Sequence, residues 1–166
     1  MSQNLAARVR KSSKALYGSL ALAILAGDQA TKALVERSVP SHTVIPVIPH
    51  FLNLVYSRNP GAAFGLFSDS PARWKTALLV VASIALLVFV VSLVWKSKPL
   101  AWQSGVGVAL ILGGAVSNLA DRIRFGQVLD FIDAYIGSYH WPSFNLADSA
   151  IVAGAGFLIF HLISSE

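Results

Sequence analysis

Two asparagine and aspartate pairs recur at the same spacing in apolar stretches of the chain. Asn118 precedes Asp121 by three positions, and Asn145 precedes Asp148 by three. Residues three apart share one face of a helix, so each pair presents an amide beside a carboxylate. An ionisable group at membrane depth costs about 3 kcal/mol or more unless it is paired or hydrated. The pairs therefore indicate a polar functional site set into apolar helices.

Paired carboxylates suit acid–base hydrolysis. Two neighbouring aspartates do not both ionise readily, so one keeps a proton while the other acts as a base toward water, which then attacks an amide carbonyl. The pattern favours aspartic protease chemistry. Spacing alone leaves open which carboxylate would join Asp148, because Asp121, Asp130 and Asp133 are all candidates.

Other catalytic classes find little support in the sequence. The chain has no cysteine, and its four histidines are scattered without the His-Glu-x-x-His spacing of zinc peptidases. Thr31 and Lys32 are adjacent, and adjacent side chains on a helix point about 100° apart, which argues against a hydroxyl–lysine dyad. The residues before Asp28 read "LAG", so the Gly-x-Gly-Asp type of intramembrane protease is disfavoured.

The composition places these residues in a membrane protein. Of 166 residues, 55% are hydrophobic and 13% are charged, whereas soluble domains carry roughly 25% charged residues. We expect one domain over 1–166 with transmembrane helices at about 15–35, 76–95, 101–121 and 144–164, each near the roughly 20 residues that cross a bilayer. The first is interpreted as a retained helix and not as a cleaved signal peptide.

The loop charges predict the orientation. The N-terminal tail carries four basic residues and no acid, and the loop after the second span carries Lys96 and Lys98 without an acid. Both segments are therefore expected in the cytoplasm, together with the C-terminus. The acidic cluster then lies at the outer face. Basic residues on the outer side moderate this bias: Arg58, Arg73, Lys75, Arg122 and Arg124.

Two further features concern packing. Small residues at four-residue spacing, Ala109, Gly113 and Ser117 in the third span and Ala150 and Gly154 in the fourth, predict close approach of these helices. Asp28 and Lys32 in the first span form either an intrahelical ion pair or a support for the site, and the sequence leaves both open.

The long outer segment, about 38–74, is expected to form a small β-rich cradle. It is rich in β-branched and aromatic residues, while Pro46 and Pro49 exclude a regular central strand and favour short edge strands on the membrane. The stretch "GAAFGLF" at 61–67 predicts a short lid helix beside the site.

Five blocks together carry a family resemblance. They are "DQATK" at 28–32, "RNPGAAFGLF" at 58–67, "GGAVSNLADR" at 113–122, "VLDFID" at 128–133 and "FNLADSAI" at 144–151. In this order among four spans, they resemble the lipoprotein signal peptidases, the type II signal peptidases of bacterial inner membranes. The resemblance covers nearly the whole chain.

The resemblance implies a fold, an activity and a set of site residues. The fold is an all-α integral membrane protein with four transmembrane helices, an extracytoplasmic cradle and a lid. The catalytic pair would be Asp130 and Asp148. Supporting roles would fall to Asp28, Lys32, Asn59, Gly61, Asn118, Asp121, Arg122 and Asn145. The apolar neighbours of Asp130 are expected to raise its pKa.

The resemblance further implies an aspartyl endopeptidase that cleaves a prolipoprotein before its diacylglyceryl-modified cysteine. It needs neither metal nor other cofactor, and we expect a monomer among membrane lipids, with its site at the periplasmic face. The alternatives are a small polar-site transporter and an inert scaffold. A transporter would repeat polar groups along a path to the cytoplasm, which the second and fourth spans lack beyond their outer ends. Nucleic acid is not expected as a partner.

Overall fold

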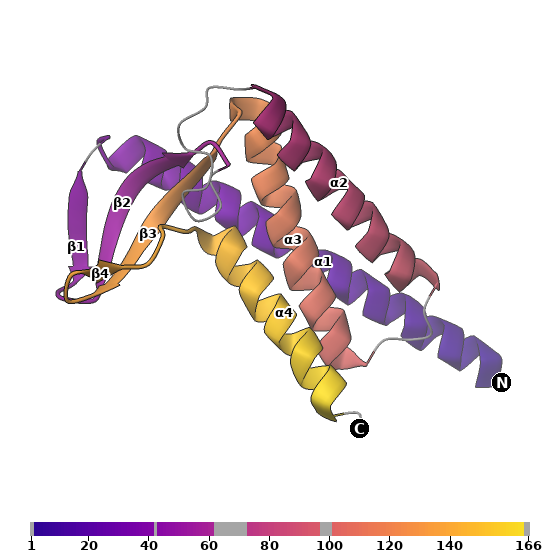
Figure 1. Cartoon of the computed structure of the whole chain (residues 1–166). Coiled ribbons are helices and arrows are strands. Elements are labelled where there is room, and N and C mark those ends of the chain that lie inside the picture. The colour runs from indigo at the N-terminus through magenta and orange to yellow at the C-terminus, as the bar shows by residue number, and fades with distance from the viewer. Residues whose placement is uncertain (1, 42, 62–72, 97–100, 165–166) are drawn as a thin grey trace.

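Four long helices and one small antiparallel sheet make up the computed structural model, which describes residues 2–41, 43–61, 73–96 and 101–164 (Figure 1). The helices are α1 (Ser2–Ser38), α2 (Arg73–Lys96), α3 (Trp102–Phe125) and α4 (Leu146–Ser164). Each contains or overlaps one expected span. Among the described residues, α3 and α4 are long and apolar enough to cross a membrane. Four spans therefore stay a prediction.

Helix α3 is the centre of the helical layer, because it contacts α1, α2 and α4. It ends at Gly126, which adopts a left-handed conformation with φ of 73° and donates its backbone N–H to the carbonyl of Arg122. Glycine takes this conformation without a steric penalty, so it ends helices well. The chain then turns directly into a strand.

Glycines set the distances between these helices. A side chain at Gly154 would meet the carbonyl oxygen of Gly107 at 2.6 Å, so α3 and α4 touch through their backbones. The predicted close approach is confirmed at Gly154. Gly113 instead lies against Ala21 of α1, where an added Cβ would meet the carbonyl oxygen at 2.6 Å. It therefore packs α3 on α1 and not on α4.

The sheet has the order β1-β2-β3-β4 and is antiparallel throughout. Its strands are β1 (Val44–Ile48), β2 (Leu52–Asn59), β3 (Val128–Ile136) and β4 (Tyr139–His140). Pro46 lies in the edge strand β1, whose register with β2 shifts between Pro46 and Ile48. An edge position tolerates the missing N–H of proline, as the sequence predicted.

The sheet is not confined to the segment between the first two spans, which corrects the expected cradle. Strands β3 and β4 come from the connection between α3 and α4, and β3 pairs with β2 over six register positions from Leu52 to Asn59. The predicted lid at 61–67 falls almost wholly on residues 62–72, which lie outside the described residues.

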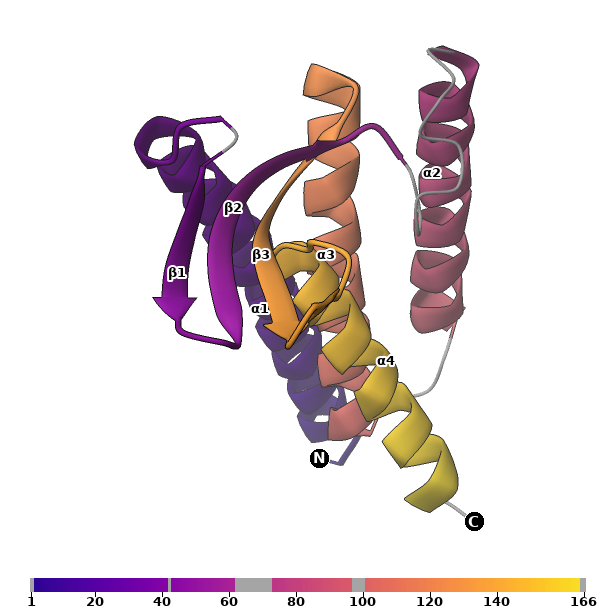
Figure 2. The same cartoon turned by 60° about the vertical axis from the view of Figure 1, so that its left-hand side comes forward.

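A small apolar core fixes the sheet to the end of α1. Val35 and Val39 at that end pack with Leu129 and Phe131 of β3, all buried. The sheet consequently lies at one end of the helices, while both chain ends lie at the other (Figures 1 and 2). This arrangement brings β3 against the ends of α1, α3 and α4.

Candidate active site

The start of α4 is built as a reciprocal helix cap. The side-chain Oδ1 of Asn145 accepts the backbone N–H of Asp148 at 2.9 Å, and Oδ2 of Asp148 accepts the backbone N–H of Asn145 at 3.2 Å. This capping box satisfies two backbone donors that a helix start otherwise leaves unpaired. The three-residue spacing of the pair thus orients the Asp148 carboxylate as well as the helix.

Asp130 faces the same helix start from β3. Its Oδ1 accepts the side-chain amide of Asn145 at 2.8 Å, and its Oδ2 accepts the amide of Asn59 at 3.0 Å. Only 3% of the residue is exposed. Burial raises the pKa of Asp130 to about 6; the amide of Asn59 opposes this rise, and the negative charge of Asp148 adds to it. The direction agrees with the expectation from its apolar neighbours.

Asn145 therefore contacts both aspartates of the expected pair. Its side-chain nitrogen donates to the Asp130 carboxylate. Its side-chain oxygen accepts the backbone N–H of Asp148, and its own backbone N–H donates to the Asp148 carboxylate. This fully buried residue thus contacts the strand carboxylate through its side chain and the helix carboxylate through its backbone N–H. The two groups are thereby gathered at the point where β3 meets α4.

Asn118 of α3 holds the other oxygen of Asp148. Its Nδ2 donates to Asp148 Oδ1 at 2.8 Å, and its Oδ1 accepts from Lys32 Nζ at 2.9 Å. An ammonium group only donates hydrogen bonds, so Lys32 fixes which way the Asn118 amide turns. Lys32 thus orients the donor that Asp148 receives.

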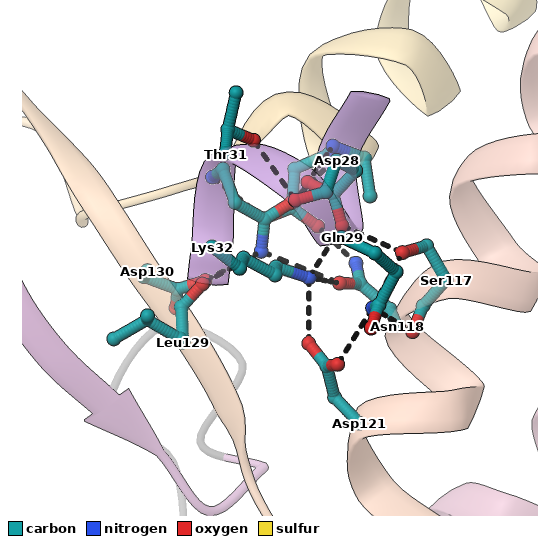
Figure 3. Close-up of polar contacts among 12 residues, drawn as sticks. Asp28, Gln29, Thr31, Lys32, Ser117, Asn118, Asp121, Leu129 and Asp130 are labelled. Atoms are coloured by element: carbon teal, nitrogen blue, oxygen red, sulfur yellow. Dashed lines mark hydrogen bonds and ion pairs between the residues drawn. The ribbon is translucent and has the colours of Figure 1, made fainter. Parts of the chain in front are cut away.

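Lys32 lies at the centre of a buried charge network (Figure 3). Its ammonium forms ion pairs with Asp28 Oδ2 and Asp121 Oδ2, each at 2.7 Å, and donates a hydrogen bond to Asn118 Oδ1. Asp28 also accepts the backbone N–H of Ala147 at 2.9 Å. The Asp28–Lys32 pair is thus an intrahelical ion pair, and its two members also hold α3 and the start of α4.

Two members of this network were not among the predicted site residues. Gln29 donates to Asp121 Oδ1 at 2.8 Å and to Ser117 Oγ at 2.9 Å, while Ser117 donates to Asp28 Oδ2 at 2.7 Å (Figure 3). Ser117 was interpreted as a packing residue only. Its position next to Asn118 and the presence of Gln29 within "DQATK" were the available signals.

Asn59 and Gly61 form a turn at the end of β2. The Gly61 N–H donates to Asn59 Oδ1 at 2.9 Å, which leaves the Asn59 amide directed at Asp130. Gly61 has a φ of 109°, a conformation that residues with a Cβ rarely adopt. A glycine at this position therefore lets the asparagine present its amide to the carboxylate.

Arg122 completes the predicted set. It interacts electrostatically with Asp148, Asp130 and Asp121, and its Nη1 donates to the Asn118 carbonyl at 3.4 Å. Its buried Nε has no hydrogen-bond partner within the described part of the chain. The guanidinium group therefore lies near the carboxylates with its Nε–H available to donate a hydrogen bond.

Asp133, which spacing had left as a candidate, lies elsewhere. It accepts the Asn53 amide at 2.8 Å and contacts His140 Nδ1 at 2.8 Å, toward the far end of the sheet. Thr31 is likewise not directed at Lys32, because its hydroxyl donates to the carbonyls of Gly27 and Asp28. Asp130 and Asp148 are therefore the two aspartates that asparagine amides hold at the junction of β3 and α4.

Comparisons with known proteins show what the whole chain is similar to. The family model described as signal peptidase (SPase) II matches residues 20–164. A lipoprotein signal peptidase of Solibacter usitatus is 46% identical over 147 residues, covering 89% of each chain. One of Desulforapulum autotrophicum is 48% identical over 147 residues, covering 86% of this chain and 88% of the relative. A bacterial membrane enzyme solved by the in meso method at 1.9 Å has a TM-score of 0.80 and 32% identity, covering 92% of this chain and 95% of the other.

Proposed function

Because the chain belongs to the signal peptidase II family, we propose that it removes signal peptides from prolipoproteins by aspartic catalysis with Asp130 and Asp148. The observation that carries the choice of residues is the shared contact of Asn145 with both carboxylates. The eight supporting residues of the expected set are assigned to holding these two groups or the substrate. The transporter and scaffold alternatives are not favoured.

The two aspartates divide the work as acid and base. The ionised carboxylate takes a proton from a water molecule, whose oxygen attacks the scissile carbonyl carbon, and the protonated partner gives its proton to the carbonyl oxygen. In the second step the proton held by the base passes to the amide nitrogen, and one hydroxyl of the tetrahedral intermediate returns a proton to the other aspartate. The C–N bond breaks, the new amine and carboxyl group leave, and the pair again holds one proton. The raised pKa of Asp130, about 6, suits a proton exchanged near neutral pH.

The supporting residues keep this pair in place. Asn59, Asn118 and Asn145 donate to the carboxylates without adding charge, so either aspartate can take the proton. Arg122 has a free buried donor beside the pair, which suits a carbonyl of the bound peptide.

We place the site at the periplasmic face of the bacterial inner membrane, with all four helices as spans and both termini in the cytoplasm. Two apolar helices and the positions of the termini opposite the sheet support this arrangement. The cleaved bond of a diacylglyceryl-modified substrate would lie at this depth, because its lipid anchors the cysteine at the surface where the signal helix ends. Buried polar side chains also favour one end: within the described residues, Ser104 near the start of α3 is the exception.

The test is cleavage of a diacylglyceryl-modified prolipoprotein by purified protein in detergent. Asp130→Asn and Asp148→Asn should each lower kcat by about 10³-fold or more, because proton transfer is lost. Asp133→Asn is the matched control, since it makes the same change three residues along β3 outside the pair, and it should keep cleavage. If Asp133→Asn is inactive and folded while Asp130→Asn is active, the assignment of the dyad is wrong.

A further inference from the structure

A cavity of about 130 Å³ lies behind the catalytic strand, between the carboxyl-terminal ends of α1 and α3 and the strands β2 and β3. This is roughly ten times the space that one water needs. Leu129 lines the cavity, whereas its neighbour Asp130 points to the other face of β3, because successive strand residues alternate. The cavity is therefore separate from the space in front of the dyad.

The charged side chains on the inner wall of the cavity are already paired with one another. Lys32 and Asp121 line it, and they are paired with each other at 2.7 Å, while Gln29 donates to Asp121. Any charge available for binding therefore lies at the mouth.

The mouth carries two arginines around one aromatic ring. The guanidinium carbon of Arg58 is 5.4 Å from the centroid of the Phe125 ring, and that of Arg124 is 5.1 Å from the same centroid. Arg58 forms an ion pair with Glu36. Arg124 has no carboxylate partner among the described residues. Two guanidinium groups facing one carboxylate leave one positive charge, and guanidinium groups bind phosphate through paired hydrogen bonds.

The mouth lies where two of the long helices end. Phe125, which lines it and is 47% exposed, is the last residue of α3, and Glu36 lies in the last turn of α1. In the membrane orientation of the proposed function, this is the level at which a membrane-spanning helix meets the headgroup layer. The phosphate of a lipid would therefore reach the arginines from within the headgroup layer.

We propose that this mouth binds the phosphate of an anionic phospholipid, held by Arg58 and Arg124. The inference uses the membrane orientation in the proposed function. A diacylglyceryl group carries no phosphate, so this lipid is distinct from the substrate anchor. Arg58 and Arg124 have no role in the proposed cleavage step, so the lipid site is independent of it.

The experiment measures lipid retention by native mass spectrometry of the full chain released from detergent micelles, a readout independent of cleavage. The probes are phosphatidylglycerol, phosphatidylcholine and inorganic phosphate. Phosphatidylglycerol should bind at least tenfold more tightly than phosphatidylcholine, because the choline cation cancels the lipid's charge. Arg124→Gln should remove this preference while keeping cleavage of detergent-solubilised substrate.

Arg37→Gln is the matched control, because Arg37 is an exposed arginine in the last turn of α1 that does not line the cavity. It should keep the tenfold preference. Equal phosphatidylglycerol binding by wild type and Arg124→Gln, or an equal loss in Arg37→Gln, would overturn the proposal. Displacement of the lipid by millimolar inorganic phosphate would overturn the lipid as occupant and assign the mouth to free phosphate.

Discussion

Asparagine amides, rather than charged groups, contact both aspartates of the proposed dyad. Asn59 and Asn145 donate to Asp130, and Asn118 donates to Asp148. A neutral donor orients a carboxylate without fixing it in the ionised form as strongly as a nearby cation would. The cation of the network, Lys32, instead reaches Asp148 through Asn118. These amides hold the oxygens of the proposed dyad in place, an arrangement that suits a proton passing between the two groups.

The spacing of Asn145 and Asp148 was readable from the sequence, but the partner of Asp148 was not. Asp130 and Asp133 lie three apart on β3, so they point to opposite faces of the sheet. Their opposite directions could be inferred only after residues 128–136 were known to form a strand. Asp121 is removed from the choice by its ion pair with Lys32, a contact across 89 positions of the sequence.

Removing the cation of the network should destabilise the protein. Lys32→Met leaves Asp28 and Asp121 buried without their shared counter-ion, so the free energy of unfolding should fall by about 3–5 kcal/mol. Chemical denaturation in detergent, followed by tryptophan fluorescence, measures this. Adding Asp121→Asn to Lys32→Met should restore part of the loss, since one buried charge is then gone. A double variant no more stable than Lys32→Met would contradict the account.

The free energy of unfolding should fall as the pH rises, because Asp130 has a raised pKa in the folded protein. Its pKa in the folded protein, about 6, lies above its ordinary value of about 3.9, so the folded state binds the proton more tightly than the unfolded chain. The associated stability is complete below about pH 4 and is lost as the pH rises through about 6. A shift of about two pKa units corresponds to about 3 kcal/mol. Between these limits, wild type should therefore lose about 3 kcal/mol more than Asp130→Asn; parallel stability curves would rule this out.

At the scale of elements, the apolar runs predicted the helices, but the sequence did not predict half of the sheet. Strand β3 pairs with β2, whose partner residues lie 69 to 82 positions earlier, and β propensity depends on such distant partners. The apolar residues of "VLDFID" therefore suggested burial without indicating a strand. The helices carried a local signal because each run matches the bilayer on its own.

The close contact between α3 and the first turn of α4 can be tested by adding a side chain at Gly114. A Cβ at Gly114 would lie 2.4 Å from the carbonyl oxygen of Ala147, next to Asp148. Gly114→Ala should therefore push α4 away, lower the free energy of unfolding by about 1–3 kcal/mol and slow cleavage. Gly156→Ala on α4 is the matched control, because nothing lies within 4 Å of its added Cβ. Thermal unfolding and cleavage rates of the two variants decide the matter, and equal behaviour would show that the contact does not position the dyad.

At the scale of the whole molecule, the helices hold the sheet and the dyad at one end and both termini at the other (Figure 1). The helix ends near the dyad carry the buried charges, so their depth in the membrane determines which compartment supplies the attacking water. Loop charges favour the outer compartment only moderately. The arrangement of the chain therefore requires a direct topological test.

The absence of cysteine makes that test simple, because any introduced thiol is the single one in the chain. Ser138, in the exposed turn between β3 and β4, and Ser164, at the end of α4, mark opposite ends of the molecule. With the sheet in the periplasm, Ser138→Cys should react with a membrane-impermeant maleimide in intact spheroplasts, whereas Ser164→Cys should react only after the membrane is opened. Labelling of Ser164→Cys from outside would invert the protein and place the dyad in the cytoplasm. Labelling of both thiols from outside would mean that α4 does not span, and the proposed depth of the cleavage site would then be wrong.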